Sequence, residues 1–190
     1  MYRSSPVGRC RVHKKFNPGE TSLSKFNEFN DNVLNGEKKE RFFFGKDMKK
    51  KFIEIDHTAD AAVQVWGSRL SDLFGHAVMG MYQIMFGSRR FEAAEPMEIS
   101  CSANTAEELL VSLLNEINYL ALFRKRAFCF PLQIHIEQET DAYQLHCQGP
   151  AAKIPANAFE HMQEIKAVTY HNLAITEEKG LLTTQIVFDL

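Results

Sequence analysis

The most informative stretch of this chain is FIEIDHTADAAVQVW, residues 52–66. Its two ends, residues 52–55 and 62–66, are rich in the branched and aromatic side chains that favour β-strands, and Gly67 breaks the second one. The polar loop between them, residues 56–60, holds one histidine and two aspartates. The pattern predicts two adjacent strands joined by a loop whose side chains could bind a ligand.

Two segments further along have the apolar spacing of helices. Between residues 70 and 85 the apolar positions recur every three or four residues, and Gly87 ends the pattern. The second segment begins at Thr105 and Glu108, which match a capping box, and carries a broad leucine-rich stripe as far as Leu120. Both segments are predicted to be helices with a buried face.

The remaining apolar segments predict strands. A hairpin is expected around the turn at residues 139–141, and Gly180 marks a later turn. We therefore expect an α+β fold of two layers, in which two helices pack on one face of a mainly antiparallel sheet. The predicted strands are residues 97–101, 132–136, 143–147, 165–171, 173–175 and 182–189.

Charge divides the 190 residues into two parts. Residues 1–50 carry 12 Lys and Arg against 6 Asp and Glu, whereas residues 51–190 carry 10 against 18. An acidic domain is poorly suited to binding RNA phosphates by itself, so contact with RNA is expected only through a partner protein. The alternative is that the basic segment acts as a weak RNA-binding arm.

Residues 1–50 show no helical or alternating periodicity over a useful window, apart from the apolar run at residues 42–44. They are predicted to be a disordered or loosely attached extension, or a stretch upstream of a natural start at Met48. Residues 51–190 are predicted to form a single domain.

The expected compartment is the cytoplasm. No apolar stretch approaches the roughly 18 residues that a membrane span requires, and no secretory signal opens the chain. The cysteines lie far apart and lack CxxC or zinc-site spacing, so we expect reduced, partly buried thiols rather than a disulfide framework or a zinc finger. They are Cys10, Cys101, Cys129 and Cys147.

No catalytic motif is present among those for hydrolase, nucleotide, dinucleotide, zinc-protease and kinase sites. Asp189, next to the terminal carboxylate of Leu190, crowds two negative charges that a cation would offset. Asp60 could complete an all-oxygen cluster suited to Ca²⁺, or to Mg²⁺ with more water retained. The alternative is a solvated chain end and an aspartate that caps a turn.

Two further residues have open roles. His57, beside two aspartates, is compatible with a general base or a metal ligand, and equally with hydrogen bonds that lock its loop. Lys166, between apolar residues on a predicted strand, either faces solvent or contacts a partner. In the second case its ammonium lies on a partner-facing surface and outside the oxygen cluster.

Four motifs in the same order and spacing resemble the archease family over about residues 51–190. The first is Ile55-Asp56-His57-Thr58-Ala59-Asp60 followed by Val65-Trp66-Gly67. The others are the leucine-rich helix at residues 109–116, the stretch IKAVTYH at residues 165–171 and the ending VFDL at residues 187–190. Archeases commonly carry an acidic residue just after the Trp-Gly pair and another after the glycine of the later strand, whereas this chain has Ser68-Arg69 and Gly149-Pro150 there.

The resemblance implies a non-catalytic activator of the RtcB-type RNA ligase of tRNA splicing and RNA repair. Such an activator promotes guanylylation of the ligase and its repeated turnover. The metal of the family, taken to be calcium, would be held here by Asp60, Asp189 and Leu190. His57 and Lys166 would belong to the functional surface. Other roles left open are a modulator or chaperone of RNA or DNA methyltransferases and a small metal-dependent enzyme.

Overall fold

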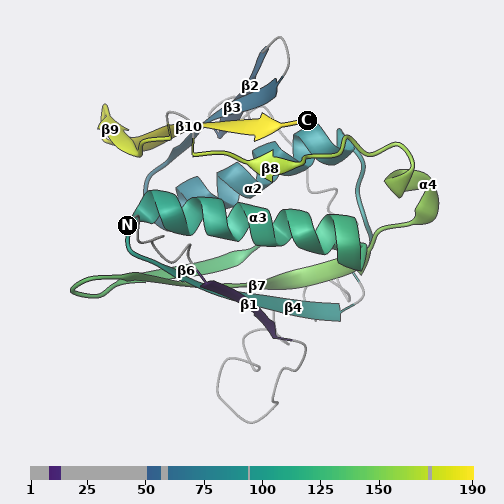
Figure 1. The fold of residues 1–190 in the computed structure, drawn as a ribbon, viewed down its shortest axis with the longest axis horizontal. Coiled ribbons are helices and arrows are strands. Elements are labelled where there is room, and N and C mark those ends of the chain that lie inside the picture. Colours follow the sequence, from purple (N-terminus) through teal and green to yellow (C-terminus); the bar gives the residue numbers. More distant parts are fainter. Residues whose placement is uncertain (1–8, 14–50, 57–59, 94, 171–172) are drawn as a thin grey trace, which may run out of the picture.

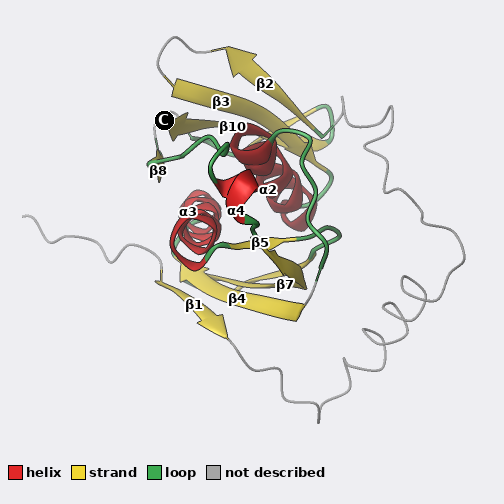
Figure 2. Cartoon of the chain, turned by 90° about the vertical axis from the view of Figure 1, so that its right-hand side faces the viewer, coloured by secondary structure: helices red, strands yellow, loops and turns green. Residues whose placement is uncertain are grey.

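The computed structural model describes residues 9–13, 51–56, 60–93, 95–170 and 173–190. In this part of the chain two β-sheets lie on either side of a layer of helices, as Figures 1 and 2 show from two directions. Every strand pairing that the described residues form is antiparallel. The predicted α+β class with antiparallel strands is therefore confirmed.

The two strands predicted in residues 52–66 are neighbours in one sheet, called sheet B here and seen at the top of Figure 1. The final strand lies on the other side of the second predicted strand, so the beginning and the end of the domain meet in this sheet. Sheet B has the order β2 (Phe52–Asp56), β3 (Asp60–Gly67), β10 (Leu181–Asp189) and β8 (Ala167–Val168), with β9 (Thr176–Glu178) also beside β10.

The second sheet, called sheet A, lies on the opposite side of the helices. Its hairpin forms around residues 139–141, as predicted, with the Glu139 amide donating to the Ala142 carbonyl at 2.8 Å. Sheet A has the order β1 (Arg9–His13), β4 (Glu95–Ala103), β7 (Tyr143–Lys153) and β5 (Arg126–Phe128), with β6 (Gln133–Gln138) also beside β7.

Both predicted helices are present, as α2 (Leu70–Phe86) and α3 (Ala106–Arg124), and a short α4 (Ala156–Phe159) follows. The capping box of α3 is confirmed. The Thr105 hydroxyl accepts from the Glu108 amide at 3.1 Å, and the Glu108 carboxylate accepts from the Asn104 amide at 3.1 Å. None of the described helices is long and apolar enough to span a membrane.

The arrangement of layers differs from the prediction. Instead of two helices on one face of one sheet, α2 packs mainly against β3 of sheet B and α3 against β4 of sheet A. The reason lies in α3, whose buried side chains lie on more than one face of the helix. Such a helix must pack against other elements on two sides. These positions are Leu109, Leu110, Val111, Ser112, Leu113, Leu114, Ile117, Asn118, Leu120 and Ala121.

The N-terminal segment also departs from expectation. Residues 9–13 form β1 beside β4, and the side chains of Cys10 and Val12 pack against the core. Cys10 lies opposite Cys101 in this pairing and forms a disulfide with it, so the expectation that all four thiols are reduced is wrong. The two cysteines are 91 residues apart in the sequence and come into contact only when β1 pairs with β4, so their spacing did not indicate a disulfide. The other residues of the segment lie outside the described part.

The remaining two cysteines are free thiols, as expected. Burial raises the pKa of Cys129 to about 11 and that of Cys147 to about 12. A thiol with so high a pKa is almost wholly protonated near neutral pH and is a poor nucleophile. These two cysteines therefore have a packing role.

Candidate functional site

Asp60 and Asp189 lie opposite each other where β3 begins and β10 ends. Both side chains are half-buried, and Leu190 follows directly. Antiparallel partners bring their side chains to the same face of a sheet within about 5.5 Å at Cβ. The pairing therefore gathers the predicted residues into one group, named the acidic corner here: Asp60, Asp189 and Leu190.

Lys166 lies at the acidic corner. Its amide donates to the Asp189 carbonyl at 2.8 Å, and its ammonium donates to the main-chain oxygen of Leu190 at 2.5 Å. The prediction that this ammonium stays outside the oxygen cluster is wrong. The reason is that the residues around Lys166 pair with β10, so its side chain reaches the end of that strand.

Helix α3 holds the Lys166 segment in place. The Asn118 side chain, which is buried, donates to the Ile165 carbonyl at 2.7 Å. The Asn115 amide group donates to the Val168 carbonyl at 3.4 Å and accepts from the Val168 amide at 3.1 Å. These contacts explain why the predicted strand at residues 165–171 is reduced to two residues, since α3 side chains take the bonds that a neighbouring strand would make.

The chemistry of the acidic corner suits a hard cation. Its donors are carboxylate and main-chain oxygens, which Ca²⁺ and Mg²⁺ prefer. Among the described residues, no three His, Cys, Asp or Glu side chains gather as a metal site, so Asp60 and Asp189 would offer a cation two side-chain carboxylates, and it would need further oxygens. Leu190 offers one, and Lys166 competes for it. His57 lies outside the described residues.

Comparison with known proteins identifies the family. The model of the archease protein family matches residues 52–190. The chain belongs to the archease family. Over 141 residues it is 28% identical to protein archease of Methanosarcina barkeri, covering 74% of this chain and 97% of that protein. To protein archease of Methanopyrus kandleri it is 30% identical over 139 residues, with 72% and 97% covered.

A solved structure supports the same assignment for the fold. The solution structure of Methanobacterium thermoautotrophicum protein 1598 superposes with a TM-score of 0.64 at 27% identity. The alignment covers 74% of this chain and 99% of that protein. Strand β1 precedes the residues that the archease family model matches.

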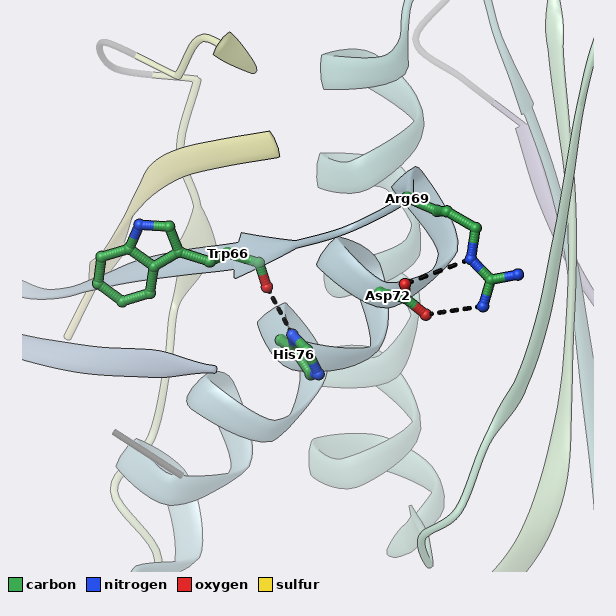
Figure 3. Close-up of polar contacts among 4 residues, drawn as sticks. All are labelled: Trp66, Arg69, Asp72 and His76. Carbon is green, nitrogen blue, oxygen red and sulfur yellow. Dashed lines mark hydrogen bonds and ion pairs between the residues drawn. The ribbon is translucent and has the colours of Figure 1, made fainter. Parts of the chain in front are cut away.

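The first departure from the archease pattern, Ser68-Arg69, lies between β3 and α2 (Figure 3). The Arg69 guanidinium donates to both carboxylate oxygens of Asp72, at 3.1 and 3.3 Å, and the hydrogen bond raises the pKa of Arg69. This exposed position thus carries an ion pair with no net charge. An archease with an acidic residue here would present a more negative surface.

His76 is held in one orientation on the same helix. Its Nδ1 lies 2.5 Å from the Trp66 carbonyl oxygen (Figure 3). A carbonyl only accepts, so Nδ1 carries the hydrogen and Nε2 remains the acceptor of the neutral ring. Gly67 allows this tight approach of β3 to α2, because a Cβ there would lie 2.3 Å from the Leu73 nitrogen.

The second departure, Gly149-Pro150, lies in β7, and its glycine has a packing reason. Gly149 is buried in β7, and a Cβ at this position would lie 2.8 Å from Cδ2 of Leu132 and 3.4 Å from the Pro131 carbonyl. Glycine therefore fits the segment that leads into β6. Nothing in the structure explains the proline that follows it, where archeases commonly carry an acidic residue.

Proposed function

We propose that this archease is a non-catalytic activator of an RtcB-type RNA ligase and presents a divalent metal ion at its acidic corner. The observation that carries the proposal is the pairing of Asp60 with Asp189 beside Leu190 in sheet B. Two carboxylates at one corner of a protein that belongs to the archease family form the start of an oxygen-rich metal site. The ligase would carry out the chemistry.

Each residue of the corner has a proposed task. Asp60 and Asp189 hold the cation, and the Leu190 oxygen adds a third donor. The Lys166 ammonium donates to that oxygen and would turn toward the partner if a metal ion took its place. A bound cation would supply positive charge for a phosphate or carboxylate group of the partner or its nucleotide. RNA would be contacted through the ligase.

The decisive experiment is ligation of RNA carrying a 3′-phosphate by a cognate ligase at limiting concentration, with and without this protein. We expect repeated turnover and more guanylylated ligase when the protein is added. Ligation by the protein alone would show an enzyme instead. Unchanged ligation would refute the proposal and leave the methyltransferase modulator and a small metal-dependent enzyme as candidates.

Matched variants connect the outcome to the acidic corner. Asp60→Asn removes one carboxylate and should reduce the stimulation at least about tenfold, because a divalent ion needs negative ligands to offset its dehydration. Asp141→Asn is the control, since Asp141 is an exposed aspartate in the turn between β6 and β7. Equal stimulation by the two variants would remove the metal from the proposal.

A further inference from the structure

The outer face of sheet A carries a row of polar side chains from four adjacent strands. Arg11 of β1 lies opposite Ser100 of β4, Ser100 opposite His146 of β7, and His146 opposite His135 of β6. The next row contains Ser102, Gln144 and Glu137. Directly opposed residues share one face of a sheet, so these side chains form a continuous surface.

These two rows line a cavity of about 430 Å³, named the donor pocket here. Its polar lining consists of Arg11, Ser100, Ser102, His135, Glu137, Gln144 and His146. The volume lies in the range of pockets that bind small molecules. Cys101 and Leu145 complete the lining, and the polar side chains supply the hydrogen-bonding groups that a charged ligand needs.

The lining supplies hydrogen-bond donors and one carboxylate, which is already engaged. That carboxylate, Glu137, accepts from Nε2 of His135 at 2.9 Å. Nδ1 of His146 lies 3.1 Å from the Ser100 hydroxyl, which positions this imidazole within the row. Among the described residues, Arg11 is exposed and has no carboxylate partner. Within the part of the chain that the structure describes, the pocket therefore holds a guanidinium without a carboxylate partner, in one row with a hydroxyl and two imidazoles.

We propose that the donor pocket binds the phosphate group of a nucleotide-sized ligand. A planar guanidinium with its fork of N–H donors matches a phosphate oxygen pair, and charge-assisted hydrogen bonds of this kind are the strong ones. The Ser102 hydroxyl, and the one donor that the hydrogen-bonded Ser100–His146 pair keeps, add to the donors around such an anion. A phosphate alone fills only a small part of a cavity of this volume, so the rest of the pocket accommodates the group that carries it.

Arg11, the residue expected to contribute most to phosphate binding, lies outside the residues that the archease family model matches. Arg11 belongs to β1, whereas the family model begins at residue 52. The side chains of Cys10 and Val12 face the core from the inner side of sheet A, and the Cys10–Cys101 disulfide fixes this orientation of β1. The Arg11 side chain, which lies between them in the strand, therefore points to the outer side. Phosphate binding is thus a property that the N-terminal segment adds to the archease domain of this chain.

Isothermal titration calorimetry of the full-length chain with AMP, inorganic phosphate and adenosine tests the proposal. We expect AMP and phosphate to bind and adenosine to bind at least about tenfold more weakly than AMP, because adenosine lacks the charged group. Two results would overturn it. One is equal affinity for AMP and adenosine, and the other is no binding of AMP or phosphate up to about 10 mM, a concentration beyond that of specific sites.

Variants assign the binding to the pocket. Arg11→Ala should weaken AMP binding about tenfold or more, while Arg124→Ala, which removes an exposed arginine outside the pocket, should leave it unchanged. Ser100→Ala, which removes a hydroxyl of the row and keeps Arg11, should weaken it less, by about threefold. Circular dichroism and melting temperature establish that each variant folds. Equal affinities of Arg11→Ala and Ser100→Ala with the unaltered chain would exclude the donor pocket as the site.

Discussion

The two sheets carry sites of opposite character on opposite sides of the helix layer (Figure 1). The acidic corner in sheet B joins two carboxylates through one strand pairing, β3 with β10. The donor pocket in sheet A takes one residue from β1 and two or three from each of β4, β6 and β7. Residues of the first site lie within or beside recognisable motifs, whereas those of the second become neighbours only through strand order.

The difference shows what a motif can reveal. Asp60 and Asp189 are visible because each stands in a characteristic local sequence, and one pairing suffices to bring them together. Arg11 and His146 have ordinary surroundings in the sequence and stand far apart along it. A site assembled from residues of several strands that are distant in the sequence becomes visible only from the strand order.

The largest effect is expected where both sites depend on the same backbone contact. Gly67→Ala places a Cβ 2.3 Å from the Leu73 nitrogen, so β3 and α2 must move apart. We expect a loss of about 3 kcal/mol or more in the free energy of unfolding, which lowers the melting temperature by about 10 °C. Thermal unfolding measures this change. Both sites should be lost together at temperatures where the variant unfolds.

Gly75→Ala is the matched control for that prediction. Gly75 lies in α2, and a Cβ there would meet only Cδ1 of Ile134 at 3.8 Å, an ordinary contact. Alanine favours a helix over glycine by roughly 1 kcal/mol, so this variant should be slightly more stable. Similar destabilisation by the two substitutions would show that the close approach at Gly67 has no special role.

The second prediction separates the two sites. Asp189→Asn removes one of the paired carboxylates and should weaken Ca²⁺ binding at least about tenfold, because less negative charge offsets the dehydration of the ion. AMP binding at the donor pocket should not change. Calorimetric titrations with Ca²⁺ and with AMP measure both affinities.

Glu178→Gln serves as the control, since Glu178 is an exposed carboxylate of β9 in the same sheet. Its removal should leave both affinities as they are. If Asp189→Asn bound Ca²⁺ as tightly as the unaltered chain, the acidic corner would not be the metal site, and the family assignment would stand.

The smallest effect concerns Lys166. Lys166→Ala removes an ammonium that lies 2.5 Å from the Leu190 oxygen, so a competing positive charge disappears from the acidic corner. An interaction of about 1 kcal/mol between exposed charges corresponds to a rise of about fivefold in Ca²⁺ affinity. Calorimetry with Lys153→Ala as the control measures it, because Lys153 is exposed at the end of β7. Unchanged affinity would instead support the partner-facing role inferred from sequence.

The sequence was sufficient for features that depend on local patterns. The strand pair in residues 52–66, the capping box at Thr105, the hairpin around residues 139–141 and the final strand all follow from periodicity and turn chemistry. Each involves neighbours in the chain. The family motifs also indicated that Asp60 and Asp189 act together. The structure agrees, because these two residues lie opposite each other where β3 pairs with β10.

The sequence did not allow us to predict which distant strands pair with each other. Periodicity shows which side chains are buried and not which strand lies beside which, so the division of the strands between two sheets could not be derived. The alternation in Arg9–His13 covers five residues, too few to stand out in a polar segment. Asn115 and Asn118 within the leucine-rich helix were the available signal that α3 holds another segment, because buried amides need partners.

The amide of Asn115 has a consequence for association between molecules. A strand at the edge of a sheet exposes unpaired peptide groups that can recruit a strand from another chain. Among the described strands, β8 pairs with β10 alone. On its free side, Asn115 offers Val168 one donor and one acceptor, as the peptide group of an adjacent strand would. A single side chain of α3 therefore blocks strand addition at this edge and limits self-aggregation without lengthening the sheet.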